Sequence, residues 1–293
     1  MLNSATPLIL TGLAVMLAFK ANVLNIGSEG QFITGAIGGF TVGYYGATHF
    51  PNLPALPMLS VLLLAGFVSG AIPALIAGLM QQYRHVPVVL STILMNFACA
   101  ILLKALLQGP LHQQQEGLAS EALPEIALLP HITIHGTATF LHYGFFIAIA
   151  LAMLLFLIFK FTVFGFKLRI TGENPTAAKF AGIRVSSVML ICLCLSGGVA
   201  GMAGAIQISG NSSYQLLPST ASLGLGFAGI AVALLGRLSP IAIIPAAIFF
   251  GWLNVAFAAL QTKLEVPSLA LQAVQGSIMI MLLIVGRLQK RTA

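Results

Sequence analysis

The chain has 293 residues, of which 58% are apolar and only 6% are charged, and its mean hydropathy is +1.01. A soluble domain carries about 25% charged residues, so this composition excludes a soluble globular protein and indicates a polytopic membrane protein. The net charge is +7, and no aspartate occurs in the sequence.

A helix needs about 20 apolar residues to cross about 30 Å of hydrocarbon, so apolar runs near that length predict the transmembrane segments. The continuous runs favour helices over a β-barrel, whose strands alternate in polarity. The predicted fold class is therefore all-α, a transmembrane helical bundle forming a single domain over residues 1–293. We predict nine spans, at approximately 6–19, 31–48, 57–80, 88–107, 143–164, 186–208, 222–236, 240–260 and 268–286.

Lysine and arginine indicate the orientation, because positive charge is retained on the cytoplasmic side. The loop at about 108–142 carries three glutamates and no lysine or arginine, so we place it outside, whereas the loop at about 165–185 is basic and cytoplasmic. Alternation then places the C-terminus in the cytoplasm and the N-terminus outside. Because this topology accounts for the positive charge, we expect no nucleic acid partner. The residues that define the cytoplasmic side are Lys20, Arg84, Lys160, Lys167, Arg169, Lys179, Arg184, Arg237, Arg287, Lys290 and Arg291, with Lys104 and Lys263 as exceptions.

The first candidate site interrupts the first two spans with the polar sequence Asn25-Ile26-Gly27-Ser28-Glu29-Gly30-Gln31. Glu29 is the only acid near the spans of the front half. A carboxylate at membrane depth is costly unless it is paired, hydrated or at a helix end, so it suggests a functional site. Asn25, Glu29 and Gln31 either contact a transported solute or cap helices around a tight turn, with Glu29 at the N-terminus of its own helix.

Small residues follow at helical spacing. Gly35, Gly39 and Gly43 form one stripe, and Gly197, Gly201 and Gly204 belong to a second set; both predict closely packed helices. Asn96 lies between them in the sequence, inside a predicted span. This uncharged polar side chain either faces a pathway or bonds to another helix.

Cysteine and histidine give no metal signal. Cys99, Cys192 and Cys194 lie within apolar spans, and residues two apart on a helix point about 200° away from each other. The loop histidines His112, His131, His135 and His142 lack a metal-ligand spacing. We therefore predict no metal site and no cofactor in this chain.

A short helix is predicted within the basic loop, at Asn174-Pro175-Thr176-Ala177-Ala178-Lys179-Phe180-Ala181-Gly182. Asn174 is suited to the N-cap, Pro175 to the first helical position and Gly182 to the left-handed turn that ends the helix. Isolated helices below about 12 residues are marginal in water. The apolar stripe Ala177, Phe180 and Ala181 is therefore expected to dock, either on this chain's own loops or on a soluble partner.

Taken together, these motifs resemble the permease subunits of ATP-binding-cassette (ABC) importers for simple sugars and nucleosides, which are similar to ribose and branched-chain amino acid permeases. The resemblance covers nearly the whole chain. The motifs that carry it are residues 12–15, 25–31, 91–96 (Ser-Thr-Ile-Leu-Met-Asn), 172–178 (Gly-Glu-Asn-Pro-Thr-Ala-Ala), 181–183, 196–205 and 229–236.

The resemblance implies a transport subunit without enzymatic chemistry, which forms the path for a nucleoside or simple sugar in an inner membrane. The implied partners are a cytoplasmic ATPase holding ATP and Mg, a second permease subunit, an extracytoplasmic solute-binding protein and membrane lipid. Such permeases generally carry one more helix before this chain's first. The short helix would be the coupling helix seated in the ATPase, and the implied coupling residues are Glu173, Asn174, Pro175, Thr176, Ala177, Ala178, Lys179, Phe180, Gly182 and Arg184.

The main alternative is an ion-coupled secondary transporter of a small polar solute. Such carriers use intramembrane ionisable pairs or broken helices at the bilayer midplane, and beyond Glu29 the sequence offers little of either. An intramembrane hydrolase would need a base near Ser91 or Ser196, and no histidine or aspartate lies within a predicted span. A passive channel would leave the docking helix without a role.

Overall fold

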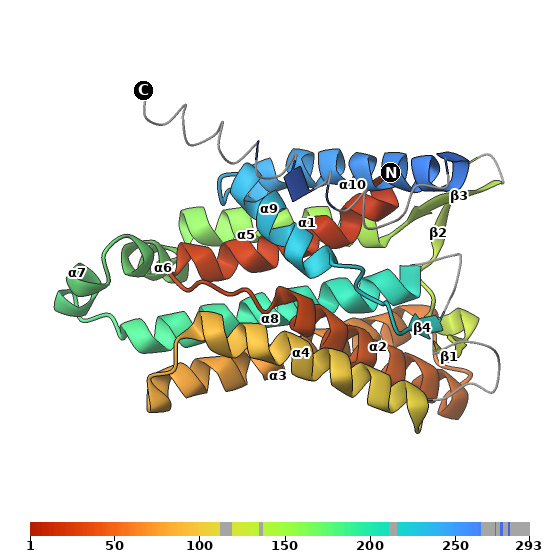
Figure 1. Cartoon of the computed structure of the whole chain (residues 1–293), viewed down its shortest axis with the longest axis horizontal. Coiled ribbons are helices and arrows are strands. Elements are labelled where there is room, and N and C mark those ends of the chain that lie inside the picture. Colours follow the sequence, from red (N-terminus) through yellow and green to blue (C-terminus); the bar gives the residue numbers. More distant parts are fainter. Residues whose placement is uncertain are drawn as a thin grey trace.

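The computed structural model describes residues 1–111, 119–134, 137–210 and 216–264, together with Ala273, Gly276, Ser277 and Met281. Figure 1 shows the helices running along the long axis of the molecule, with short strands at one end and α7 at the other. The helices are α1 (Leu2–Lys20), α2 (Ser28–His49), α3 (Ala55–Arg84), α4 (Val88–Gln108), α5 (Gly144–Phe161), α6 (Val163–Glu173), α7 (Pro175–Phe180), α8 (Val185–Gly210), α9 (Leu225–Leu235) and α10 (Pro240–Leu264).

Six described helices are long and apolar enough to cross a membrane, namely α1, α3, α4, α5, α8 and α10. The predicted span 31–48 corresponds to α2, which has 22 residues but a more polar, glycine-rich sequence. The predicted span 222–236 is wrong as a full span, because α9 has only 11 residues and a helix of that length rises about 16 Å. The ninth prediction, 268–286, lies largely outside the described residues.

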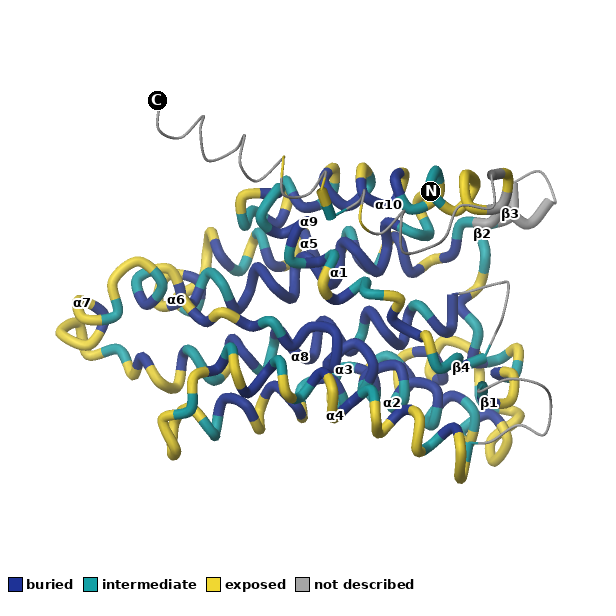
Figure 2. The backbone as a smooth tube through the Cα atoms, viewed as in Figure 1, coloured by how far each residue is buried: buried dark blue, intermediate teal, exposed yellow. Residues whose placement is uncertain are grey.

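The centre of the bundle is α1, which is buried from Ala5 to Ala18 (Figure 2). It packs against α5, α8, α9 and α10. A helix that is apolar on all sides can be surrounded by other helices without burying unsatisfied groups. By contrast, α3, α4, α5 and α10 each keep one face exposed, as expected for helices at the lipid boundary or at a contact with another protein.

Glycines bring α2, α3 and α8 together. A Cβ added to Gly35 of α2 would lie 2.1 Å from Gly201 Cα of α8, and one added to Gly204 would lie 2.1 Å from Phe32 O. A Cβ added to Gly39 would lie 2.7 Å from Ala205 Cβ. The backbones are thus too close for any larger side chain, as in other small-residue interfaces.

The third helix of this contact supplies glycines that the sequence analysis did not single out. A Cβ on Gly201 would lie 2.2 Å from Gly66 O of α3, and one on Gly197 would lie 2.6 Å from Gly70 O. Close packing is therefore present at these glycines, and a Cβ added to Gly43 would lie 2.8 Å from Leu62 Cδ1 of α3.

Two small antiparallel sheets cover the end opposite α7, a feature that the all-α prediction missed. Strand β1 (Ala119–Ala122) pairs with β4 (Leu216–Pro218), and β2 (His131–Ile134) pairs with β3 (Thr137–His142). The one-turn helix η1 (Glu125–Ala127) lies between β1 and β2. These segments fall in the predicted outer loop and in the connection that precedes α9.

Two chain segments interrupt the bundle halfway along its long axis. Between α1 and α2 the chain is non-helical over residues 21–27, and α2 begins near the middle of the molecule (Figure 1). Between β4 and α9 the chain returns from the strand-bearing end, and α9 also begins near the middle. The first turns of α2 and α9 therefore meet inside the bundle.

Candidate functional site

Glu29 joins the two interrupted segments. It lies in the first turn of α2, but its carboxylate binds the start of α9 instead of its own helix. Oε1 accepts hydrogen bonds from the Ser222 hydroxyl and, at 3.1 Å, from the backbone N of Gly224. Oε2 accepts from the backbone N of Gly226 at 2.9 Å and of Phe227 at 3.3 Å. The carboxylate thus satisfies free N–H groups at the positive end of α9.

The close approach of α2 and α9 depends on Gly226. A Cβ on Gly226 would lie 2.5 Å from Glu29 Cα, so only glycine allows α9 to start this close to α2. Glu29 is 8% exposed. A buried carboxylate is tolerated here because four donors replace the water that it loses.

Asn25 and Gln31 form a second part of the same network. Their side-chain amides pair with each other, with Asn25 Nδ2 donating to Gln31 Oε1 at 2.9 Å and Gln31 Nε2 donating to Asn25 Oδ1 at 3.1 Å. Asn25 also donates to Ser196 Oγ of α8 at 2.9 Å and accepts from Gly27 N at 2.9 Å. The non-helical turn before α2 is therefore bonded both to itself and to α8.

Asn96 completes the network from α4. Its Oδ1 accepts from Gly30 N at 2.8 Å, and its Nδ2 donates to Ile26 O at 3.0 Å. Asn96 therefore satisfies backbone groups on both sides of the start of α2. We call the buried side chains Asn25, Glu29, Gln31, Asn96, Ser196 and Ser222 the polar junction.

The four predicted path residues, Asn25, Glu29, Gln31 and Asn96, thus converge at one place. Their hydrogen bonds explain their burial, because they support the chain where α2 and α9 begin. Their contact with a transported solute stays a prediction. Two residues of this site were not predicted from the sequence. Ser222 donates a hydrogen bond to Glu29, and Gly226 leaves space for its backbone. The Ser-Leu-Gly-Leu-Gly sequence at 222–226 is a possible helix-start signal, but it lay within a run assigned to a continuous span.

The short helix predicted at 174–182 has the expected local structure. In α7, Asn174 Oδ1 accepts from the backbone N of Thr176 at 3.1 Å and of Ala177 at 3.0 Å, and Pro175 is the first helical residue. Gly182 has φ +77°, the left-handed value expected after the helix end. Its function as a coupling helix remains a prediction.

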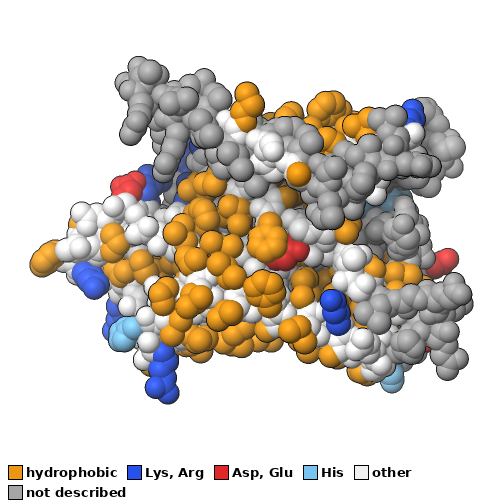
Figure 3. All heavy atoms as spheres, viewed as in Figure 1, with side chains coloured by type: hydrophobic (Ala, Val, Ile, Leu, Met, Phe, Trp, Pro, Cys, Tyr) orange, Lys and Arg blue, Asp and Glu red, His pale blue; other side chains and the backbone are white. Residues whose placement is uncertain are grey.

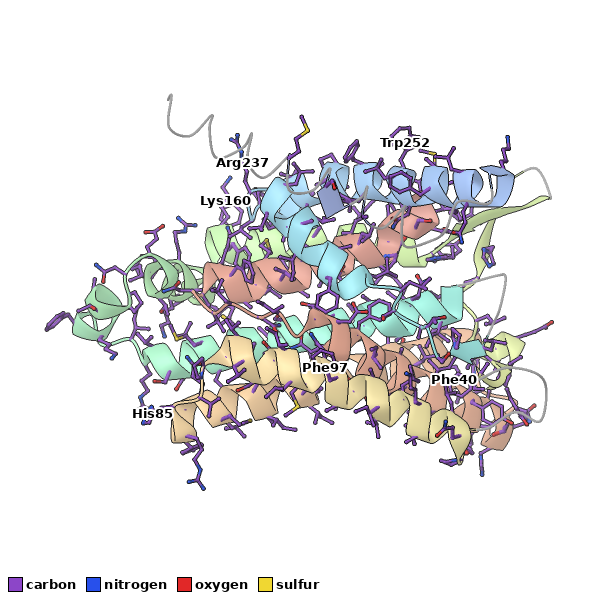
Figure 4. All side chains as sticks on the ribbon, in the orientation of Figure 1. Phe40, His85, Phe97, Lys160, Arg237 and Trp252 are labelled. Carbon is purple, nitrogen blue, oxygen red and sulfur yellow. The ribbon has the colours of Figure 1, made fainter. Side chains whose placement is uncertain are left out.

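The apolar stripe of α7 does not dock on the described part of this chain. Phe180 is 90% exposed, and Ala177 and Ala181 are exposed as well. Only Ala178 is buried, on the side that faces the rest of the protein. Figure 2 shows α7 as an exposed projection beyond the bundle. The basic residues Lys160 and Arg237 lie toward the same end (Figure 4).

Among the described residues, no group of three or more histidine, cysteine or glutamate side chains could hold a metal ion. His131 and His142 are neighbours in the β2–β3 hairpin, with ring centroids 6.3 Å apart. Burial, and secondarily the nearby His131, lowers the pKa of His142 to about 4, so this side chain is neutral at neutral pH. His112 and His135 lie outside the described residues.

The fold and the polar junction define a multi-pass helical membrane protein in which the starts of two helices, α2 and α9, meet inside the bundle. One solved structure, a transporter described as of the metal-chelate ABC type in an inward-facing conformation, aligns with 97% of this chain and 83% of its own, with a TM-score of 0.54 and 17% identity. At that identity the match supports the fold of an ABC permease.

The chain belongs to the family described as the permease component of the branched-chain amino acid transport system, which matches residues 1–285. A guanosine ABC transporter permease of Bacillus subtilis is 30% identical over 100% of this chain and 84% of the relative. A glucose ABC transporter permease of Haloferax volcanii is 31% identical over 95% of this chain and 74% of the relative. The protein is therefore an inner-membrane transport subunit of an ABC importer, as the resemblance implied, and the family implies partnership with an ATPase and a substrate-binding protein.

Helix ends inside the bundle also occur in ion-coupled carriers. Here the carboxylate of Glu29 occupies the N-terminus of α9, and the family match decides in favour of the ABC permease.

Proposed function

We propose that this permease carries a nucleoside or a simple sugar, and that α7 is the coupling helix through which an ATPase drives it. The cargo class is supported by the guanosine and glucose permeases to which the chain is similar. The coupling assignment is supported mainly by one observation, the 90% exposure of Phe180 on a capped helix at the basic end of the molecule.

An exposed phenylalanine on a six-residue helix is poorly explained by this chain alone. Burying such a side chain against a partner is favourable by about 1.5–3 kcal/mol. Lys179 and Arg184 are exposed around it and would pair with acidic groups on the ATPase. In the proposed complex, Glu173, Asn174, Pro175 and Thr176 form the start of the helix, Ala177, Ala178 and Phe180 its body, and Gly182 its end.

We further propose nine membrane crossings. They are formed by the six long helices, by α2, by α9 together with the chain that precedes it, and by 268–286. In this topology the outer sheets lie outside, and α7 and the C-terminus lie in the cytoplasm. Figure 3 supports the membrane placement, since hydrophobic side chains cover the middle of the visible face and several lysines and arginines gather at the α7 end.

The proposed path runs beside the polar junction. Non-helical backbone at membrane depth is tolerated where protein buries it or where it lines a water-filled cavity. Leu24 in the first interrupted segment is 54% exposed, and Leu223 in the second is 72% exposed. Phe97 of α4, labelled in Figure 4, is 65% exposed close to Asn96. A second permease subunit facing these residues would enclose a path between the two chains.

The test of the coupling assignment is co-purification of the tagged permease from its native membranes in mild detergent. The wild-type chain is expected to retain a stoichiometric ATPase, and the Phe180→Asp variant is expected to lose it. Tyr83→Asp is the matched control, because Tyr83 is 71% exposed at the end of α3 but outside α7. The assignment would be overturned if the Phe180→Asp variant retained as much ATPase as the Tyr83→Asp variant.

The cargo proposal is tested separately, by ATP-dependent uptake into vesicles that contain the reconstituted complex. Labelled guanosine, adenosine, ribose and glucose are supplied with the cognate binding protein. Uptake of a nucleoside or sugar supports the proposal, and transport of amino acids alone contradicts it.

A further inference from the structure

A cavity lies at the cytoplasmic end of the bundle, apart from the polar junction. Its volume is about 340 Å³. It is formed where α6 crosses the ends of α1 and α5. Its lining includes Lys20 of α1, Phe159 of α5, and Leu168, Arg169, Gly172 and Glu173 of α6.

The walls of this cavity are fixed by close backbone contact. A Cβ on Gly172 would lie 1.9 Å from Lys20 O, so α6 rests directly on the end of α1. Phe159 and Leu168 are buried, and Gly165 is packed against the backbone of Phe159. The cavity is therefore a built feature between three helices and not a gap beneath a loop.

Two cations converge in the cavity on the same residue. Lys20 Nζ lies 4.9 Å from the centroid of the Phe159 ring, and Arg169 Nη2 donates a hydrogen bond to Phe159 O at 3.2 Å. Within the described part of the chain, neither cation has a carboxylate within 4.0 Å. Glu173 lines the same cavity but is exposed and forms no ion pair there.

Two like charges held close together without an anion are unfavourable, and the arrangement favours an anionic ligand. An arginine fork and a lysine ammonium suit a phosphate group, the arginine through paired N–H donors and the lysine as a point charge. The apolar walls suit the carbon atoms attached to that phosphate. Basic pockets on the cytoplasmic side of membrane helices are suited to anionic lipid head groups.

We propose that Lys20 and Arg169 form a binding site for a phosphate group, and that the ligand is the head group of an anionic phospholipid of the cytoplasmic leaflet. The acyl chains would lie along α5, whose Leu154 and Leu157 are exposed. Because Glu173 directly precedes the Asn174 cap of α7, a bound head group sits at the base of that helix. The binding site does not depend on the proposed coupling function or cargo, but its assignment to the cytoplasmic leaflet rests on the proposed topology.

The experiment measures lipid binding to the full chain, purified in a neutral detergent, by native mass spectrometry. Phosphatidylglycerol is compared with phosphatidylcholine of the same acyl chains, and inorganic phosphate is titrated as a competitor. We expect at least tenfold tighter binding of phosphatidylglycerol. Competition by millimolar inorganic phosphate would assign the site to a soluble phosphate, whereas resistance to it assigns the site to the lipid.

The variants separate this site from general surface charge. Lys20→Met and Arg169→Gln are each expected to weaken phosphatidylglycerol binding about tenfold, while Arg169→Lys keeps most of the affinity. Glu173→Gln should strengthen binding several-fold, since it removes a negative charge from the cavity. Lys167→Gln is the matched control, because Lys167 lies on α6 and is exposed but does not line the cavity.

Variants are compared only where the melting temperature without added lipid equals that of the wild-type chain. If Arg169→Gln fails this condition, Lys20→Met alone decides. The proposal is overturned if the two lipids bind equally, if the Lys20→Met and Arg169→Gln variants both keep the wild-type preference, or if Lys167→Gln weakens binding as much as Lys20→Met.

Discussion

The polar junction and α7 differ in how their side chains are covered by the rest of the chain. In the junction, the Glu29 carboxylate is 8% exposed and accepts four hydrogen bonds from the chain itself. In α7, Phe180 is 90% exposed and its neighbour Lys179 has no ion pair among the described residues. A polar group is thus buried and satisfied in the membrane region, while an apolar group is left uncovered outside it.

This contrast separates what the chain completes alone from what it leaves to a partner. The junction holds two interrupted helices together, so its loss should reduce stability first and transport as a consequence. Ala178 is the buried residue of α7, so disruption of this helix should remove coupling and leave the membrane fold intact.

The largest effect is expected from the double substitution Ala177→Asp and Phe180→Asp. Two carboxylates on the exposed stripe would be buried without partners in an ATPase groove, which is strongly unfavourable. We expect ATP-driven uptake to be abolished while expression, membrane insertion and melting temperature stay at wild-type values. Normal uptake by this variant would rule out α7 as the coupling helix.

The next effect is expected from Glu29→Ala. It leaves the Ser222 hydroxyl and three backbone N–H groups without their acceptor, and each unsatisfied buried donor costs about 1–3 kcal/mol. We expect a clear fall in the melting temperature in detergent. Glu29→Gln keeps one acceptor oxygen, so it should lose less stability.

The Glu29 variants also distinguish the two interpretations of the junction. If Glu29→Gln keeps its stability but loses uptake, the carboxylate acts on the transported solute. If stability and uptake fall together, the role is architectural. Unchanged uptake with unchanged stability would remove Glu29 from both roles.

A smaller effect is expected from Asn96→Leu. This change leaves Gly30 N and Ile26 O without partners, and each unsatisfied buried group costs about 1–3 kcal/mol. The melting temperature should fall less than in Glu29→Ala. Phe97→Leu is the control on the same helix, since Phe97 is mostly exposed and makes no hydrogen bond. An equal fall in both variants would show that α4 packing, and not the Asn96 bonds, supports the junction.

The smallest effect is expected from Asn174→Ala, which removes the cap of α7. Loss of an N-cap side chain costs about 1 kcal/mol, so uptake should fall about fivefold, given that 1.4 kcal/mol is a factor of ten. Asn174→Ser should restore most of the uptake. The melting temperature of the bundle should not change, in contrast to the junction variants.

The features that the sequence predicted well are set by neighbouring residues. Asn174, Pro175 and Gly182 specify the start and end of α7 within nine residues, so its local structure could be read directly. The long apolar runs behind α1, α3, α4, α5, α8 and α10 likewise follow from hydropathy alone. The stripe glycines were predicted as packing residues, because their spacing of about one helical turn is visible without a partner.

The partner of each feature was decided by tertiary structure. Glu29 was expected at the N-terminus of its own helix, yet its carboxylate binds Ser222 and Gly226, nearly 200 positions away. Gly201 meets Gly66 of α3, a residue that the sequence analysis did not single out. Side-chain spacing shows which face of a helix can pack closely, but not which of several apolar helices will cover it.

Composition and capping act over a few residues, so they suffice to predict a helical membrane protein with a capped helix outside the bundle. Local sequence did not reveal that the run at 222–236 contains a helix of 11 residues, or that the start of this helix meets the start of α2. An apolar run has the same hydropathy whether its backbone bonds are made within one helix or by a distant carboxylate. The choice depends on that long-range hydrogen bonding, which local sequence does not record.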